Sequence, residues 1–185
     1  MAPSTVLPDT FARAVADLSV PSPRPEIVLE ELTAPQKLAP FGHALGGTVS
    51  RRGEEVATGR LILLYDPAGH DAWEGSLRLV TYVTAEIEAE MATDPLLATV
   101  GWSWLTDALT ERGATHTAVA GTVTQTMSTR FGDLAGPPAS ADLEIRASWT
   151  PLAENLTDHL LAWCDLLAST AGLPPPGVTA LHRPG

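Results

Sequence analysis

Apolar and polar positions alternate with a period of two along residues 77–91. The odd positions carry apolar or small side chains, namely Leu77, Leu79, Thr81, Val83, Ala85, Ile87, Ala89 and Met91. The even positions are mostly polar or charged, namely Arg78, Val80, Tyr82, Thr84, Glu86, Glu88 and Glu90. Because successive side chains of a strand point to opposite faces of a sheet, this pattern predicts one long strand with an apolar side and a polar side.

Similar patterns predict the other elements. Alternation and short apolar runs predict strands at 26–32, 43–50, 55–65, 115–128 and 142–149. Apolar residues at helical spacing predict helices from Asp9 or Thr10 to Leu18, from Asp94 to Gly113 and over 155–171, with Gly172 as the stop. Residues 66–75 are expected to form a long connecting loop.

The order of these elements is helix, four strands, helix, two strands, helix. Strands that follow one another without a helix between them form antiparallel hairpins. We therefore expect an α+β fold, an antiparallel sheet of about five to six strands with helices packed on one face. We expect a single domain over 9–172, preceded by a frayed N-terminus at 1–8 and followed by a Pro-rich, loose C-terminal tail at 173–185.

Composition narrows the class of protein. The chain has 185 residues, and 44% hydrophobic with 18% charged residues argue against global disorder. A formal net charge of −11 disfavours direct binding to nucleic acid or to an anionic membrane surface. The sequence shows no signal-peptide pattern and no apolar run of the roughly 18 residues that cross a bilayer. With a single cysteine that suits a reducing compartment, we expect a soluble, cytoplasmic, acidic protein.

The predicted sheet has a polar face whose purpose is open. It would carry residues from three strands, namely Arg78, Tyr82, Thr84, Thr122, Thr124, Thr126, Glu144 and Arg146. Cross-strand threonine pairs and Arg–Glu pairs stabilise a sheet by themselves, so this face can simply be solvated or form a homodimer. Alternatively it binds a polar partner, and Arg78 and Arg146 would then anchor a small anion.

Two of the five tryptophans are candidates for the same binding surface. Trp104, Trp149 and Trp163 fall on the apolar stripes of their elements and are expected in the core. Trp102 lies on the flank of its predicted helix, and Trp73 lies in the predicted loop. Large aromatic side chains at such positions often anchor interfaces.

No stretch of the chain carries a specific catalytic or cofactor-binding motif. The five histidines never fall at the spacing of a helical metal site, so we expect no metal and no cofactor. His70, followed by Asp71, is the one histidine that resembles a base beside an orienting carboxylate. Repulsion among Glu86, Glu88 and Glu90, all on one side of a strand end, would keep other strands from pairing there.

Several short segments carry a resemblance. They are 57–61, 94–97 with 102–105, 121–124, 144–151, and 162–167 with 171–175. The most specific are Glu144-Ile145-Arg146-Ala147-Ser148-Trp149-Thr150-Pro151 and Ala162-Trp163-Cys164-Asp165-Leu166-Leu167. Over about residues 10–181 the chain resembles a family of uncharacterised proteins from high-GC Gram-positive bacteria. That family is a domain of unknown function, so the resemblance implies no catalytic residues.

Three hypotheses about function follow from these residues. The first is a non-enzymatic binding or adaptor protein that uses the polar sheet face for a protein partner or a second copy of itself. The second is a small-molecule enzyme that acts on an anionic substrate held by Arg78 and Arg146, with His70 as the base. The third is a purely structural subunit. The sequence favours the first, because it contains no catalytic motif.

Overall fold

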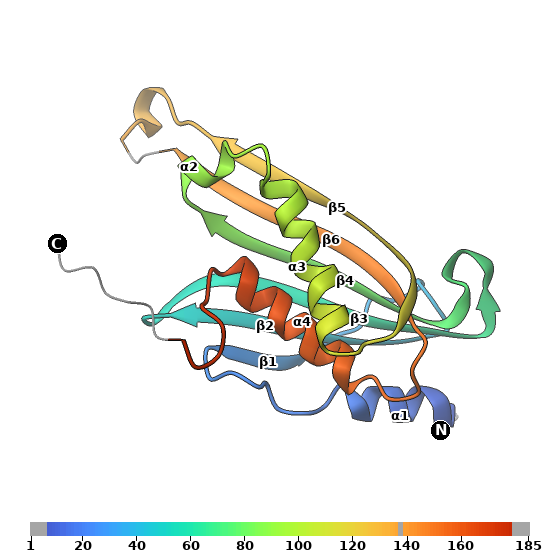
Figure 1. Cartoon of the computed structure of the whole chain (residues 1–185). Coiled ribbons are helices and arrows are strands. Elements are labelled where there is room, and N and C mark those ends of the chain that lie inside the picture. The colour runs from blue at the N-terminus through green and yellow to red at the C-terminus, as the bar shows by residue number, and fades with distance from the viewer. Residues whose placement is uncertain (1–6, 137–138, 179–185) are drawn as a thin grey trace, which may run out of the picture.

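A twisted antiparallel sheet of six strands forms the frame of the protein (Figure 1). The computed structural model describes residues 7–136 and 139–178. Residues 1–6 of the predicted N-terminal segment and 179–185 of the predicted tail lie outside the described residues. The elements are α1 (Asp9–Asp17), β1 (Ile27–Leu32), β2 (Phe41–Arg51), β3 (Glu54–His70), η1 (Asp71–Trp73), β4 (Gly75–Ile87), α2 (Ala89–Ala92), α3 (Leu97–Glu111), β5 (His116–Ser128), η2 (Gly132–Leu134), β6 (Ser140–Pro151) and α4 (Thr157–Thr170).

The strands follow the order β1-β2-β3-β4-β6-β5, and every neighbouring pair is antiparallel. β6 therefore separates β4 from β5, and these two strands run parallel to each other. A parallel pair cannot be joined by a tight hairpin, so the chain crosses between them through α3. α3 and α4 lie on the same face of the sheet (Figure 1). The predicted α+β class, with an antiparallel sheet and helices on one face, is confirmed.

The predicted long strand is β4, although it is shorter than expected. Leu79 and Val83 are fully buried on the apolar side, which confirms the alternation. The strand ends at Ile87, and the chain then turns into the short helix α2. Glu88 precedes that helix and Glu90 lies within it, so the predicted row of glutamates along one strand edge is wrong. Alternation alone did not reveal where the chain leaves the sheet.

The core lies between the sheet and α3 and α4. Gly47 of β2 pairs with Gly59 of β3, and both lie directly beneath α4. A Cβ atom at either glycine would come within 2.7 Å of the Leu167 side chain, so only glycine lets the helix approach this closely. Trp163 fills the same place, and its indole Nε1 donates to Thr81 Oγ1 at 2.8 Å. The Thr81 hydroxyl in turn donates to a backbone carbonyl of β3, which satisfies a polar pair inside the core.

Helix ends agree with the sequence in part. Asp94 Oδ1 accepts a hydrogen bond from the Leu96 amide at 2.8 Å, next to the start of α3. Gly113 has a φ of 68°, a left-handed conformation that suits glycine and ends the helix as predicted. Asp9 and Thr10 are residue types that often cap a helix, and the sequence predicts one of them as the cap of α1. This prediction is wrong, because Pro8 occupies the N-cap position and no side chain caps the helix.

The connection between β3 and β4 differs from the predicted loop. β3 continues to His70, with an irregularity between Tyr65 and His70, and the turn is the short helix η1. The segment thus forms the end of a long hairpin. Its aromatic residues stack on each other, with the ring centroids of His70 and Trp73 4.8 Å apart.

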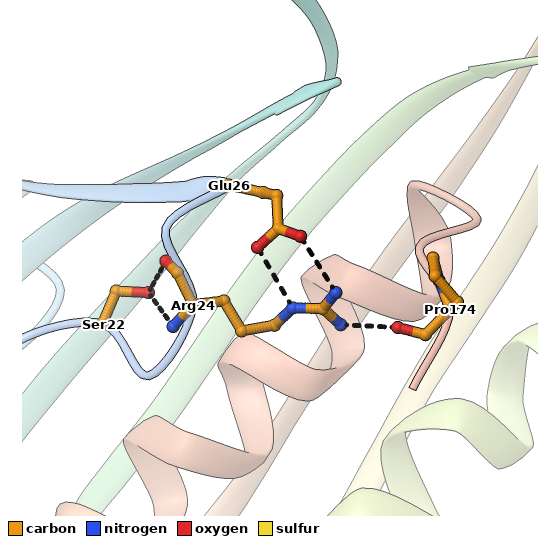
Figure 2. A network of polar contacts seen from close by, with 4 residues as sticks. All are labelled: Ser22, Arg24, Glu26 and Pro174. Carbon is orange, nitrogen blue, oxygen red and sulfur yellow. Dashed lines mark hydrogen bonds and ion pairs between the residues drawn. The ribbon is translucent and has the colours of Figure 1, made fainter. Parts of the chain in front are cut away.

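A polar network holds the start of the predicted tail against the N-terminal half (Figure 2). Arg24 forms an ion pair with Glu26 and donates from Nη1 to the carbonyl of Pro174 at 2.9 Å. Ser22 Oγ donates to the Arg24 carbonyl and accepts from its amide. On the neighbouring side, Arg112 Nε donates to Asp165 Oδ2 at 2.6 Å and joins α3 to α4. These contacts keep the helical layer in place on its side of the sheet.

Candidate functional site

The face of the sheet opposite α3 and α4, here called the free face, presents its side chains in rows that cross the strands. The register of the strands defines three rows. The apolar row consists of Leu32, Ala44, Ile62, Val80, Ser148 and Ala120. The charged row consists of Glu30, Gly46, Arg60, Tyr82, Arg146 and Thr122. The hydroxyl row consists of Val28, Thr48, Thr58, Thr84, Glu144 and Thr124.

The centre of the charged row is Tyr82, flanked by one arginine on each neighbouring strand. Arg60 of β3 and Arg146 of β6 both pair with Tyr82 in register. Neighbouring strands lie about 4.8 Å apart, so the two arginine Cα atoms are separated by about 10 Å. The guanidinium carbon of Arg146 lies 5.1 Å from the centre of the Tyr82 ring, a cation–π contact. The structure thus places one arginine on each side of a single aromatic ring in an otherwise acidic protein.

Glu144 connects the two predicted residues Tyr82 and Arg146. The Tyr82 hydroxyl donates to Glu144 Oε2 at 3.0 Å, and Arg146 Nε donates to Glu144 Oε1 at 2.6 Å. The hydrogen bond to Glu144 is the main cause that raises the pKa of Tyr82, because it favours the protonated phenol. Three residues singled out from the sequence therefore form one contact group. Thr122 and Thr124 lie beside it on β5 and are exposed.

Arg60 is a member of this site that sequence reasoning missed. It is exposed, and it forms no ion pair with a carboxylate anywhere in residues 7–136 or 139–178. The signal was present in the sequence, because Thr58, Arg60 and Ile62 alternate with the buried residues Gly59 and Leu61. The apolar run 61–65 that follows is typical of a strand covered on both sides, and such a run does not distinguish a free face from a buried one.

Two hollows lie on either side of Tyr82. The first has a volume of about 550 Å³ and is lined by parts of β1 to β4, including Leu32, Arg60 and Ile62. The second has a volume of about 530 Å³ and is lined by parts of β4, β6 and β5, including Arg146 and Ala120. Pockets of this size suit small molecules or short segments of a partner. Apolar side chains form part of the lining of each hollow, and each lining also includes one arginine, Arg60 in the first and Arg146 in the second.

Arg78 lies on the free face but is only 7% exposed, unlike the open anchor that the sequence predicted. Its Nη1 donates to Thr150 Oγ1 at 3.1 Å, and its Nη2 donates to Ser148 Oγ at 2.7 Å. Thr150 Oγ1 also donates to the carbonyl of Trp73, so the end of the β3–β4 hairpin folds over this end of the face. Burial lowers the pKa of the Arg78 guanidinium. In this position Arg78 supports the joint between β4 and β6.

The two candidate tryptophans lie apart from each other. Trp73 belongs to η1 and is half-buried against His70. Trp102 of α3 is half-buried over Gly121, where any side chain would collide with its ring. Trp102 therefore lies on the helix side of β5, away from the free face. Trp104, which was expected in the core, is only partly buried and lines a hollow beside the C-terminal segment.

The histidines and the cysteine divide between exposed and buried positions. His70 is exposed at the end of the β3–β4 hairpin. His159 is fully buried in α4, accepts a hydrogen bond at Nδ1 from Trp149 Nε1 at 3.1 Å, and has its pKa lowered to about 4 by burial. Cys164 is also fully buried, and burial raises the pKa of its thiol to about 12. At that pKa the thiol is a packing group in neutral solution.

The described residues contain neither a cluster of metal ligands nor a membrane-spanning helix. Among residues 7–136 and 139–178, no three His, Cys, Asp or Glu side chains come together in a way that could hold a metal ion. Within the same residues, no helix is both long enough and apolar enough to cross a membrane.

The fold and the face together define an α+β protein whose antiparallel sheet is covered by helices on one side and carries an arginine-flanked tyrosine on the other. Over residues 7–179 the chain matches a family described as "Protein of unknown function (DUF3000)". The match covers most of the chain, so this protein belongs to the DUF3000 family. Comparison with curated proteins and with solved structures gives no match.

Proposed function

We propose that this protein is a non-enzymatic binding or adaptor module that holds a protein partner on its free face. The observation that carries this proposal is the row Arg60–Tyr82–Arg146, which runs between two hollows of about 550 and 530 Å³. Tyrosine and arginine are both enriched among the residues that contribute most to binding at the centres of protein interfaces.

The chemistry of the face indicates which partner would fit. The apolar row lies next to the charged row, so a bound segment would place apolar side chains on Ile62 and Val80 and carboxylates near Arg60 and Arg146. Arg146 uses only its Nε for Glu144 among the described residues, which leaves its terminal nitrogens available to a carboxylate. We therefore expect a partner segment that combines apolar and acidic side chains.

The contact can be tested by photocrosslinking from the centre of the row. A photoreactive phenylalanine analogue replaces Tyr82, the protein is irradiated in its native cells, and crosslinked partners are identified by mass spectrometry. The control places the same analogue at Val100, an exposed position of α3 on the opposite side of the sheet. We expect a specific partner from position 82 and none from position 100.

Two arginine substitutions complete this experiment. Arg60→Ala combined with Arg146→Ala should remove the crosslinked partner while the protein stays folded, because both side chains are exposed. Arg13→Ala, an exposed change on α1, serves as the matched control and should keep the partner. If the double variant captures the same partner with equal yield, the arginine row does not bind it and the proposal fails.

A further inference from the structure

The two edges of the sheet differ in how well they are protected from pairing with another chain. β1 has six residues, and two of them, Glu30 and Glu31, are charged. β5 has thirteen residues and contains no Asp, Glu, Lys or Arg. Natural proteins usually protect an exposed edge strand with charges, prolines or a short length. Within residues 7–136 and 139–178, β5 pairs only with β6, so its outer backbone groups are open to another strand.

The regular part of β5 is long enough to pair. An irregularity lies between Thr117 and Ala120, where Ala118 has a φ of 51°. From Ala120 to Ser128 the register with β6 is unbroken over nine residues. This stretch is longer than an average strand, and none of its side chains carries a charge.

A third hollow, called the edge hollow, lies next to this strand on the helix side. It has a volume of about 410 Å³ and is lined by Ala98, Thr99, Trp102, Gly121 and Val123. Met127 lies six residues after Gly121, on the same side of the same strand, and is 47% exposed. Methionine packs well against aromatic rings, so the side chain and the hollow are chemically matched. They lie too far apart along one strand, about 20 Å, to meet within one molecule.

We propose that two copies of this chain pair through β5, antiparallel and about a two-fold axis near Thr124. Full overlap of 120–128 with itself places Met127 of each copy opposite Gly121 of the other, so each Met127 enters the partner's edge hollow. The same register places Thr122 opposite Thr126 on the free face, a favourable cross-strand pair. The result is one continuous sheet of both copies, with all helices on the same side.

The distribution of charge favours pairing of two copies through β5 over pairing through β1. Each chain carries a net charge of −11, so two copies repel each other, and a stable contact must at least bring no like charges of its own directly together. β5 meets this condition, whereas self-pairing of β1 would bring glutamates together. In the proposed register, the row that ends in Arg146 and Thr122 continues into the partner's Thr126 and Asp142, which brings opposite charges into one row on each side of the axis. The row at the axis runs from Glu144 and Thr124 to the partner's Thr124 and Glu144, with the two threonines between the carboxylates.

The first experiment measures the mass of the full chain in solution by sedimentation equilibrium over a range of concentrations. We expect a dimer of twice the chain mass of 19.5 kDa. Met127→Glu should weaken the association by roughly tenfold or more, because it places a charge in an apolar hollow of an acidic partner. Leu38→Glu is the matched control: Leu38 is 58% exposed, compared with 47% for Met127, and it lies between β1 and β2, at the other edge of the sheet. It should leave the dimer unchanged.

The second experiment locates the contact by crosslinking with a short bis-maleimide. The native Cys164 is fully buried, so a cysteine introduced on the surface is the one that reacts. Thr124→Cys, at the proposed axis, should give covalent dimers. Val28→Cys, exposed on the opposite edge strand, should not. A monomer at every concentration overturns the proposal, and so does a dimer that tolerates Met127→Glu or crosslinks through Val28→Cys. None of these three results would contradict the proposed function of the free face, because that function rests on Arg60, Tyr82 and Arg146.

Discussion

The two faces of this sheet are built from the same alternating strands, yet their side chains are held in different ways. On the helix side, Trp149 and Trp163 are fully buried, and each indole N–H donates to a buried side chain. On the free face, Tyr82 and Arg146 are joined through Glu144 but remain in contact with water. A substitution on the helix side removes packed volume and should therefore lower stability. A substitution on the free face removes solvated contacts and should mainly affect binding.

The largest effect is expected from Trp163→Ala. The change removes a fully buried ring from beneath α4 and leaves the Thr81 hydroxyl without its donor. Truncation of a buried tryptophan costs about 3–5 kcal/mol of unfolding free energy, which approaches the whole stability of many domains. Urea unfolding measures the loss. Trp104→Ala, on a partly exposed tryptophan of α3, is the control and should cost clearly less. Equal losses of unfolding free energy in the two variants would mean that the packing of Trp163 between α4 and the sheet contributes no more to stability than that of Trp104.

A pH-dependent effect of intermediate size is expected at His159. Its pKa in the folded protein is about 4, against an ordinary value of 6.5, because burial disfavours the charged ring. The unfolded chain therefore takes up a proton below about pH 6.5 that the folded protein does not take up until about pH 4. This group alone lowers stability as the pH falls through that window, by up to about 3 kcal/mol in total.

The His159→Gln variant tests this dependence. Glutamine can still accept a hydrogen bond from Trp149 but has no proton to gain, so unfolding free energy should fall less steeply between pH 6.5 and pH 4 than in the unmodified protein. His70→Gln, on the exposed hairpin, is the control. Parallel pH profiles for His159→Gln and the unmodified protein would show that His159 is not the group responsible.

The smallest effect on stability is expected on the free face. Glu144→Gln weakens the contacts to Tyr82 and Arg146, and partly exposed ion pairs of this kind contribute no more than about 1 kcal/mol. The same change should bring the pKa of Tyr82 down towards its ordinary value, because the bond to Glu144 is the main cause that raises it. Absorbance titration of the phenol measures this shift, with Tyr82→Phe identifying the signal. An unchanged Tyr82 titration would mean that the Tyr82–Glu144 bond does not persist in solution.

Local patterns predicted which side of each strand faces the core. The alternation of 77–87 predicted Leu79 and Val83 in the core and Tyr82 on the opposite face, and the structure confirms this. Successive side chains of a strand point to opposite faces, so burial alternates from one residue to the next and can be predicted from a short stretch of sequence. The same reasoning predicted the helix ends at Gly113 and Gly172, which both have a positive φ. It failed where the period broke, at the turn after Ile87 and in the β3–β4 hairpin.

The sequence by itself thus determined the class of fold, the order of the elements and the two faces, since each depends on contacts between near neighbours or on periodicity. Tertiary structure alone decided that β6 lies between β4 and β5, and hence that Arg60, Tyr82 and Arg146 stand in one row. It also decided that Arg78 is covered by the hairpin that carries Trp73. Strand order, register and the covering of one segment by another depend on residues far apart in the chain, and no local pattern records which distant strand becomes a neighbour.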